Sequence, residues 1–372
     1  MSAPTRILLM AGGTGGHVFP ALAVADELRG CGVEVSWLGT RSGLEAEVVP
    51  QAGYPIDFID VSGLRGKGKA SLVMAPFKLL QALWQSQAVM RQQRPAAVLG
   101  MGGFVTGPGG VAAWLSRRPL LIHEQNASAG LTNRLLVPLA SRVMEAFPHT
   151  LRGALHTGNP LRREFFDQSL STDFAAAEFL GVLRLLVVGG SLGAVRLNEV
   201  VPEALALLAR GSSDASGLVL NTGARIEVWH QTGRRNIEQA RGAYAAAGIE
   251  ARVEPFIDDM AEAYRWADLV LCRAGAMTVA ELAAAGTASI LVPYPHAVDD
   301  HQTANARYLT DGGAAVLLPQ QALSAQRLVQ LLQELDGVRL REMGMMARKL
   351  ALPEATVRVA GHCLEVVRAL SM

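Results

Sequence analysis

The sequence predicts an α/β protein built from two doubly wound, Rossmann-like domains that face a central cleft. Two observations favour this fold: a strand, glycine loop and helix pattern occurs twice, and short apolar runs alternate with Ala- and Leu-rich helical stretches. Strands that alternate with helices pair into parallel sheets. A length of 372 residues fits two such domains, because one domain takes roughly 150 residues.

The repeated pattern marks the start of each domain. An apolar run, a glycine loop and a helix follow one another over residues 6–28 and again over residues 184–208, with the glycine loops at residues 12–17 and 189–194. Further apolar runs predict strands at residues 97–100, 119–122, 142–146, 267–271 and 288–292. Sheets of this kind bind ligands outside the carboxyl ends of their strands, where the glycine loops lie.

These patterns divide the chain into three parts. Residues 1–160 are expected to form the first domain and residues 161–340 the second, with a hinge near Gly158-Asn-Pro160. Residues 341–372 form a helical tail, and one arrangement packs this tail back on the first domain.

Composition predicts a folded protein of the cytosol that does not cross a membrane. Apolar residues make up 50% and charged residues 18%, which is enough for buried cores and too little charge for disorder. The three cysteines are widely spaced without a Cys-x-x-Cys pair, which fits neither a disulfide framework nor a zinc site. The N-terminus shows no signal-peptide pattern. No apolar run reaches the roughly 18 residues that span a bilayer.

The glycine loops predict a phosphate-bearing ligand. At a strand-to-helix turn, backbone N–H groups and the helix N-terminus can approach an anion. A dinucleotide fold would also need an acidic residue about 20 residues later, but the predicted strand at residues 34–38 ends in Gly39-Thr-Arg41. Residues 63–69 match most of a Walker A loop, yet Ala70 stands where a Ser or Thr is needed. We interpret them as a mobile basic loop.

No metal ion and no organic cofactor are expected. The chain contains neither an Asp-x-Asp pair nor a His-Glu-x-x-His motif. Helix N-termini would then stabilise a leaving diphosphate without a metal.

Six motifs, spread over nearly the whole chain, together resemble the MurG family. They are residues 10–20 (MAGGTGGHVFP), 63–67 (GLRGK), 100–104 (GMGGF), 123–126 (HEQN), 158–160 (GNP) with Arg162, and 273–281 (RAGAMTVAE). The resemblance implies the B-type glycosyltransferase fold. It also implies inverting transfer of N-acetylglucosamine from UDP-N-acetylglucosamine (UDP-GlcNAc) to a lipid-linked muramyl-pentapeptide precursor, the step from lipid I to lipid II in peptidoglycan synthesis.

The resemblance further implies location and partners. The enzyme would be peripheral to the cytoplasmic face of the bacterial inner membrane, with the UDP-sugar in the C-terminal domain and the acceptor in the N-terminal domain. Its partners would be UDP-GlcNAc, the undecaprenyl-diphosphate-linked muramyl pentapeptide, an anionic membrane surface and cell-wall synthesis or division proteins, and no nucleic acid.

Site residues are carried over from the motifs position by position. The implied donor contacts are Thr14, Gly15, Gly16, Asn126, Arg162, Ser191, Ile257, Ala276, Met277, Thr278, Val279, Ala280, Glu281 and Gln302. Gly102 and Gly103 would contact the acceptor diphosphate. Leu192 is a departure, because the family usually has Gln in that loop.

Two residues are candidates for the general base. His17 follows the first glycine loop, and histidine is the side chain that ordinarily changes protonation near neutral pH. An alternative role for His17 is to position the acceptor, and Glu124 is the second candidate base. In the other domain the Glu281 carboxylate suits a ribose diol, or is an ordinary solvated helix residue. Ser191 and Arg162 would bind the diphosphate.

A stretch without acidic residues predicts a membrane-associating surface. Residues 62–122 contain no Asp or Glu and eight Lys or Arg residues. Apolar side chains accompany them at Leu72, Val73, Met74, Phe77, Leu79, Leu80, Leu83 and Trp84. Basic residues beside exposed aromatic residues suit anionic lipid. The alternative is that these apolar residues are core.

Three rival functions share the predicted ligand class. They are a UDP-sugar 2-epimerase, another lipid glycosyltransferase of the same fold, and a non-catalytic membrane scaffold that binds a nucleotide sugar. An epimerase would release free sugar nucleotide, whereas a scaffold would bind without turnover.

Overall fold

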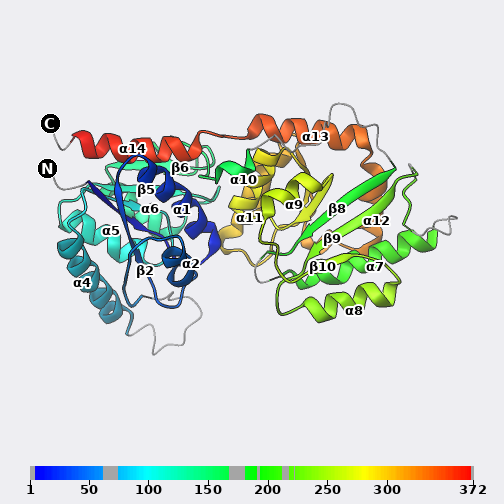
Figure 1. Cartoon of the computed structure of the whole chain (residues 1–372), viewed down its shortest axis with the longest axis horizontal. Helices are drawn as coiled ribbons and strands as arrows, with labels where there is room; N and C mark the ends of the chain where they lie inside the picture. The colour runs from blue at the N-terminus through cyan, green and yellow to red at the C-terminus, as the bar shows by residue number, and fades with distance from the viewer. Residues whose placement is uncertain are drawn as a thin grey trace. The chain divides into compact units, whose positions relative to one another are not determined.

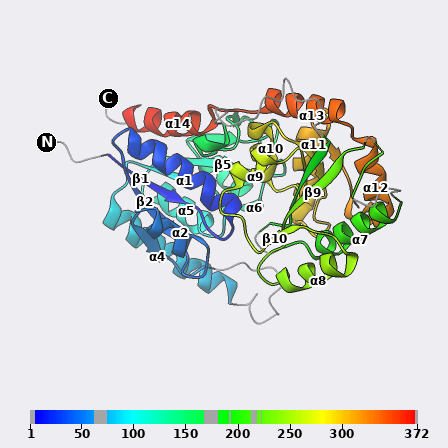
Figure 2. The same ribbon diagram turned by 45° about the vertical axis from the view of Figure 1, so that its right-hand side comes forward.

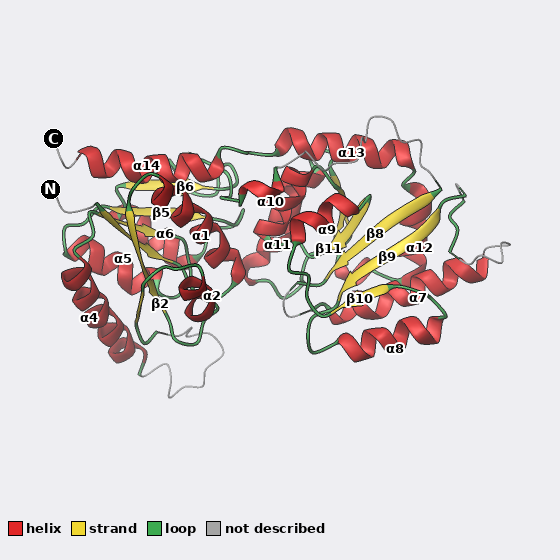
Figure 3. Ribbon diagram, in the orientation of Figure 1, coloured by secondary structure: helices red, strands yellow, loops and turns green. Residues whose placement is uncertain are grey.

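The computed structural model describes residues 5–61, 74–166, 181–190, 193–211, 218–221 and 223–369. The chain forms two compact units, one made of Met1–Arg162 with Leu352–Met372 and the other of Arg163–Ala351. Figure 1 follows the chain through both units, and Figure 3 shows that each consists of a strand layer flanked by helices.

The first unit contains a parallel sheet of seven strands in the order β3-β2-β1-β4-β5-β6-β7. Its strands are β1 (Arg6–Met10), β2 (Glu34–Gly39), β3 (Ile56–Phe58), β4 (Ala97–Gly100), β5 (Leu120–Glu124), β6 (Arg142–Glu145) and β7 (Leu155–His156). Its helices are α1 (Gly15–Gly30), α2 (Glu45–Gln51), α4 (Ala75–Gln93), α5 (Thr106–Leu115), α6 (Leu131–Leu136) and α14 (Ala355–Ala369), with a 3-10 turn at Val137–Leu139.

The second unit contains a parallel sheet of six strands in the order β10-β9-β8-β11-β12-β13. Its strands are β8 (Val182–Val188), β9 (Arg225–Gln231), β10 (Arg252–Glu254), β11 (Leu269–Cys272), β12 (Ala288–Leu291) and β13 (Ala315–Leu317). Its helices are α7 (Val195–Gly211), α8 (Ile237–Ala247), α9 (Met260–Trp266), α10 (Ala276–Ala285), α11 (His301–Thr310), α12 (Ala325–Glu334) and α13 (Gly337–Leu350). Short 3-10 turns lie at Arg163–Phe165, Val298–Asp300 and Gln320–Ala322.

Both sheets reverse their strand order at an equivalent place. In the first sheet β1 pairs with β2 on one side and β4 on the other, and in the second β8 lies between β9 and β11. The prediction of two doubly wound α/β domains is therefore confirmed. Ligands of such sheets bind at the carboxyl ends of the strands beside this reversal, so we call these regions the first and second carboxyl edges.

The central strand of the first unit contributes side chains to cores on both faces of its sheet. Ile7 and Leu9 pack with residues of α1 and α14, whereas Leu8 and Met10 pack with residues of α4 and α5. A parallel strand covered on both faces is apolar throughout, which explains the uninterrupted run that begins this domain. Figure 2 shows α1 and α14 on one side of the sheet and α4 on the other.

The last helix of the chain belongs to the core of the first unit. Val359, Ala360, Cys363 and Val367 of α14 are buried in the same cluster as residues of α1 and β1. The apolar face of this helix thus covers part of the sheet that the start of the chain builds.

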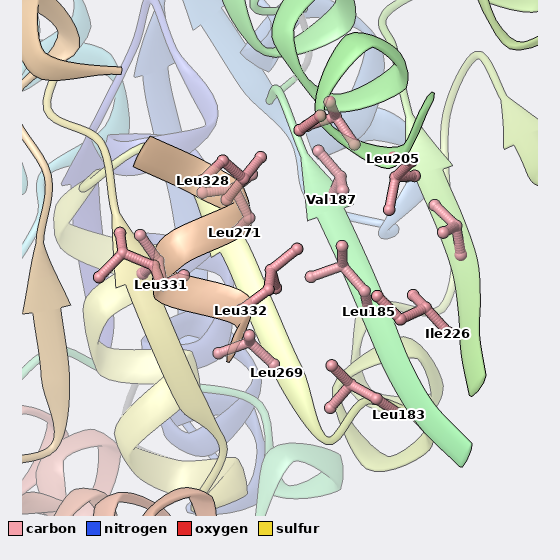
Figure 4. Close-up of a cluster of buried hydrophobic side chains, with 14 of the residues drawn as sticks. Leu183, Leu185, Val187, Leu205, Ile226, Leu269, Leu271, Leu328, Leu331 and Leu332 are labelled. Atoms are coloured by element: carbon pink, nitrogen blue, oxygen red, sulfur yellow. The ribbon is translucent and has the colours of Figure 1, made fainter. Parts of the chain in front are cut away.

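The core of the second unit is Leu-rich. Leu183, Leu185 and Val187 of β8 point to one face of the sheet, where they meet residues of α7 and α12 (Figure 4). Leu328 and Leu332 of α12 supply the facing side chains. This packing holds the carboxyl end of β8 in place, and with it the start of the second glycine loop.

Candidate functional site

The first carboxyl edge is built from two glycine loops in direct contact. Gly13 follows β1 and has a φ of +92°, while Gly102 and Gly103 follow β4 with φ of +99° and +85°. These values lie in the left-handed region that favours glycine. A Cβ atom on Gly103 would also strike the carbonyl oxygen of Gly12. The loops therefore approach as closely as they do because both lack side chains.

Helix α1 begins inside the first glycine loop. Thr14 is its exposed N-cap residue, and Gly15 and Gly16 are its first two residues. The first N–H groups of a helix have no intrahelical acceptor and carry the positive end of the helix dipole. The geometry of this turn therefore suits an anionic group. The helix begins at Gly15, before Pro20, where the apolar helical pattern of the sequence starts.

His17 lies against both glycine loops. Its Nδ1 is 3.3 Å from the carbonyl oxygen of Gly12. A Cβ atom on Gly102 would lie 2.6 Å from His17 Cδ2 and 2.8 Å from Nε2. Because a carbonyl oxygen can only accept, Nδ1 carries the hydrogen in this contact, and the lone pair of a neutral ring is then on Nε2. The half-buried ring can thus act as a proton acceptor through Nε2.

Glu124 ends β5 and supports the loop that follows. The residue is 2% exposed. Its Oε1 accepts hydrogen bonds from the backbone N (3.0 Å) and Nδ2 (3.3 Å) of Asn126. Its Oε2 accepts from the backbone N of Gly130 (3.0 Å) and from Nδ2 of Asn133 (2.8 Å). Both oxygens therefore hold the loop in place, and the loop fixes Asn126 at the carboxyl edge.

His123 is a buried structural residue next to this loop. Its Nε2 lies 3.0 Å from the carbonyl oxygen of Gly158, and its Nδ1 lies 3.2 Å from Nε2 of Gln125. Burial lowers the pKa of His123 to about 4, because desolvation disfavours the charged ring. At neutral pH the side chain is uncharged.

Arg162 is the last residue of the Met1–Arg162 segment of the first unit, and it is exposed.

The second carboxyl edge also has a glycine loop that packs closely against a neighbouring loop. Gly190 follows β8 with a φ of +79°, and Gly193 has a φ of +76°. A Cβ atom on Gly193 would strike the carbonyl oxygen of Thr232, which follows β9. Ser191 and Leu192 lie outside the described residues, and so do Leu72, Val73 and the basic loop of residues 63–69.

Helix α10 presents its N-terminus at this edge. Gly275 is the N-cap residue and Ala276 the first helical residue. Met277, Thr278 and Ala280 are half-buried. Val279 is fully buried and packs in the core. Ile257, in the loop after β10, is also buried.

Two polar side chains at the second edge are held by neighbours that the sequence analysis did not single out. The hydroxyl of Tyr264 donates a hydrogen bond to Oε2 of Glu281 at 3.1 Å. Burial, with the nearby charge of Glu281, raises the pKa of Tyr264, so the phenol stays protonated as the donor. Gln302 accepts a hydrogen bond from the backbone N of Tyr294 at 2.9 Å.

Arg273 fixes the loop after β12. Its Nη1 donates to the carbonyl oxygens of Val292 (3.1 Å) and Pro293 (3.3 Å), and its Nη2 donates to Oε1 of Gln320 (2.6 Å). Burial lowers the pKa of this guanidinium from its ordinary value. Arg273 stands in one of the quoted motifs, yet only the fold reveals that it positions the loop containing Tyr294. Glu45, whose carboxylate joins the loops after β1 and β2, was missed for a similar reason.

Over the ranges that the structure describes, no group of three or more His, Cys, Asp or Glu side chains is placed to hold a metal ion. Within the same ranges, no helix is both long enough and apolar enough to span a bilayer.

Comparison with known proteins assigns the chain to a family. Residues 7–145 match the glycosyltransferase family 28 N-terminal domain, and residues 184–359 match the family 28 C-terminal domain. A relative from Nitrosococcus oceani is 58% identical over 97% of this chain and 98% of its own length. It is named UDP-N-acetylglucosamine--N-acetylmuramyl-(pentapeptide) pyrophosphoryl-undecaprenol N-acetylglucosamine transferase. The crystal structure of Acinetobacter baumannii MurG is 42% identical, has a TM-score of 0.78, and covers 97% of this chain and 100% of that one.

The chain belongs to the MurG family. The resemblance seen in the motifs and the expected B-type glycosyltransferase fold are thereby confirmed. A UDP-N-acetylglucosamine 2-epimerase structure also aligns over 96% of this chain with a TM-score of 0.64, but at 13% identity it shares the fold alone. The MurG family is a glycosyltransferase family, so the epimerase reading is disfavoured.

Proposed function

We propose that this MurG-family protein transfers N-acetylglucosamine from UDP-GlcNAc to the undecaprenyl-diphosphate-linked muramyl pentapeptide, converting lipid I to lipid II. The observation that carries the proposal is the Nitrosococcus oceani relative, which is named as the transferase of this reaction. It is 58% identical to this chain over 98% of its own length. The two carboxyl edges support it, because each has a glycine loop and a helix N-terminus suited to phosphate groups.

The reaction is a direct displacement with inversion. The acceptor hydroxyl oxygen attacks the anomeric carbon of the donor sugar, and the bond from that carbon to the diphosphate oxygen breaks. UDP leaves with the bonding electron pair, while Nε2 of His17 accepts the hydroxyl proton. A positioned general base contributes about 10²- to 10⁴-fold. His17 suits this role better than Glu124, because both oxygens of Glu124 already accept hydrogen bonds from their own loop.

The second unit is proposed to hold the donor. The N-terminus of α10 would stabilise the negative diphosphate through its first backbone N–H groups. The Glu281 carboxylate, held by Tyr264, would accept hydrogen bonds from the ribose hydroxyls. The first unit would then bind the acceptor, with the amides at the start of α1 and the Gly102–Gly103 loop near its diphosphate.

A surface on α4 and α5 is proposed to dock on anionic lipid at the inner face of the bacterial plasma membrane. Phe77, Leu80 and Trp84 of α4 are 65%, 63% and 76% exposed, at the spacing of one helix face. Lys78 is exposed beside them, and Trp114 and Leu115 are exposed on α5, which packs against α4. Leu83, in contrast, packs against the core. Most of the described apolar residues of this stretch thus favour the interfacial reading over the core reading.

The proposed reaction is tested with radiolabelled UDP-GlcNAc and a short-chain lipid I analogue. Label entering the lipid fraction, also in the presence of EDTA, would support metal-independent transfer. Donor binding without transfer would contradict the proposal, and release of an epimerised free sugar nucleotide would restore the epimerase alternative.

The membrane proposal is tested by co-sedimentation with vesicles of phosphatidylglycerol. Replacing Phe77, Leu80 and Trp84 with Ser should abolish binding at low salt. Val357→Ser, an exposed apolar position on α14, is the matched control and should bind normally. Equal binding by both variants would contradict the assignment of this surface.

A further inference from the structure

Glu45 places a buried carboxylate directly behind the first glycine loop. It is the first residue of α2, and its side chain is 0% exposed. Its Oε2 accepts a hydrogen bond from the backbone N of Gly13 at 2.9 Å. Its Oε1 accepts hydrogen bonds from the backbone N and from Oγ1 of Thr40, both at 2.8 Å. Glu45 therefore joins the loop after β1 to the loop after β2.

Three glycines provide the space for this carboxylate. A Cβ atom would lie 2.6 Å from Glu45 Oε1 if added to Gly12, and 2.7 Å from Glu45 Cγ if added to Gly39. On Gly43 it would strike both carboxylate oxygens. A buried carboxylate is costly unless hydrogen bonds compensate its lost hydration. The loops thus form a site that fits this one charged group closely.

One peptide group connects Glu45 to His17. The peptide between Gly12 and Gly13 donates its N–H to Glu45, and its C=O accepts from Nδ1 of His17 at 3.3 Å. Because a peptide group is planar, fixing the direction of its N–H also fixes the direction of its C=O. Hydrogen bonds in series also polarise one another, so the carboxylate strengthens the carbonyl as an acceptor.

We propose that Glu45 is a positioning residue that acts on His17 through the Gly12–Gly13 peptide. The carboxylate holds the imidazole in the tautomer with hydrogen on Nδ1, which leaves Nε2 as the proton acceptor. The arrangement resembles a carboxylate–histidine pair with a peptide group inserted between its members. Its catalytic consequence rests on the proposed function, in which Nε2 of His17 receives the proton of the acceptor hydroxyl.

Glu45→Gln tests the proposal with a side chain of the same shape. One end of the amide is a donor, so it cannot accept from both Gly13 and Thr40. We expect kcat to fall by about 10- to 100-fold, the range found when a group that orients a metal-bound histidine is lost. KM for UDP-GlcNAc should stay within about twofold, because ground-state donor binding is unaffected. Glu47→Gln, an exposed position on the same helix, is the matched control and should leave kcat unchanged.

Two further readouts separate positioning of His17 from a merely structural role. In a His17→Ala background, Glu45→Gln should lower kcat by less than about threefold, because residues that act as a unit are not additive. The ¹⁵N spectrum of His17 should show hydrogen on Nδ1 in the parent protein and a mixture of tautomers in Glu45→Gln. An unchanged tautomer, or the same fold-loss of kcat in both backgrounds, would overturn the proposal.

The tautomer spectrum also keeps this proposal separate from the reaction itself. If the parent protein made no lipid-linked product, the proposed function would fail, whereas the spectrum would still report whether Glu45 controls His17. If Glu45→Gln did not fold, Thr40→Val removes only the hydroxyl that donates to Oε1. We expect a partial shift in tautomer from that variant, and an unchanged spectrum would count against the proposal.

Discussion

Replacing Glu124 with Gln should release the loop of residues 125–130. In the structure each carboxylate oxygen accepts two hydrogen bonds, from Asn126 on one side and from Gly130 and Asn133 on the other. In Glu124→Gln one oxygen becomes an amide that faces two donors. Two hydrogen bonds to a charged group are then lost, at about 1.5–3 kcal/mol each. We expect the loop to lose at least about 3 kcal/mol of local stability.

Hydrogen exchange measures this loss directly. The backbone amides of Asn126 and Gly130 donate to Glu124, so they should exchange about 100-fold faster in the variant, the factor that corresponds to about 3 kcal/mol. Glu145→Gln is a matched control, because Glu145 accepts from the amides of His149 and Leu151 in a neighbouring loop. It should leave exchange at residues 125–130 unchanged. Loss of transfer with normal exchange in Glu124→Gln would refute the reasoning and return Glu124 to the role of base.

Three other variants follow from the two edges and the core. Gly103→Ala should lower the melting temperature and the rate of sugar transfer more than Gly153→Ala does. Both glycines have positive φ, but of the two only Gly103 lacks room for a Cβ atom. Equal melting temperatures would contradict this prediction. Burial lowers the pKa of His230 to about 3. As pH falls below about 6.5, the unfolded chain therefore takes up a proton at this residue before the folded protein does. The free energy of unfolding then decreases between pH 6.5 and pH 3, by up to about 5 kcal/mol. The double variant His230→Leu, Tyr244→Phe should flatten that pH dependence in urea titrations, and an unchanged slope would argue against it. Glu281→Ala should weaken UDP-GlcNAc binding in calorimetry by roughly tenfold or more, as expected for lost hydrogen bonds to a charged group, and unchanged affinity would remove its proposed role.

Much of the fold could be predicted from the sequence, because buried parallel strands leave a strong local signal. The apolar runs at residues 97–100, 142–146 and 288–292 correspond closely to β4, β6 and β12. Strand β9 was not predicted, since Arg225–Gln231 mixes charged, polar and apolar residues. Its place beside β8 comes from pairing along the whole strand, which no local pattern reveals.

The candidate site could also be predicted only in part. The glycine loops of residues 12–17 and 189–194 could be predicted because the left-handed turns at Gly13, Gly190 and Gly193 require glycine. The contacts of the acidic residues could not. Glu124 follows the strand predicted at residues 119–122 and lies in a polar motif, which is also typical of a catalytic carboxylate. Only its four hydrogen bonds show that it supports a loop. Glu45 gave no sequence signal at all.

The sequence by itself thus determined the fold class, the ligand chemistry and, through six spaced motifs, the family. These depend on local periodicity and on residue types that a short segment needs for its own conformation. Only the tertiary structure decided which charged groups face which loops, because those contacts join segments far apart in the chain. The hydrogen bond from Gly13 to Glu45 spans 32 positions, and the packing of α14 on α1 brings the last helix against the first. Such pairings form only when the sheet brings the segments together.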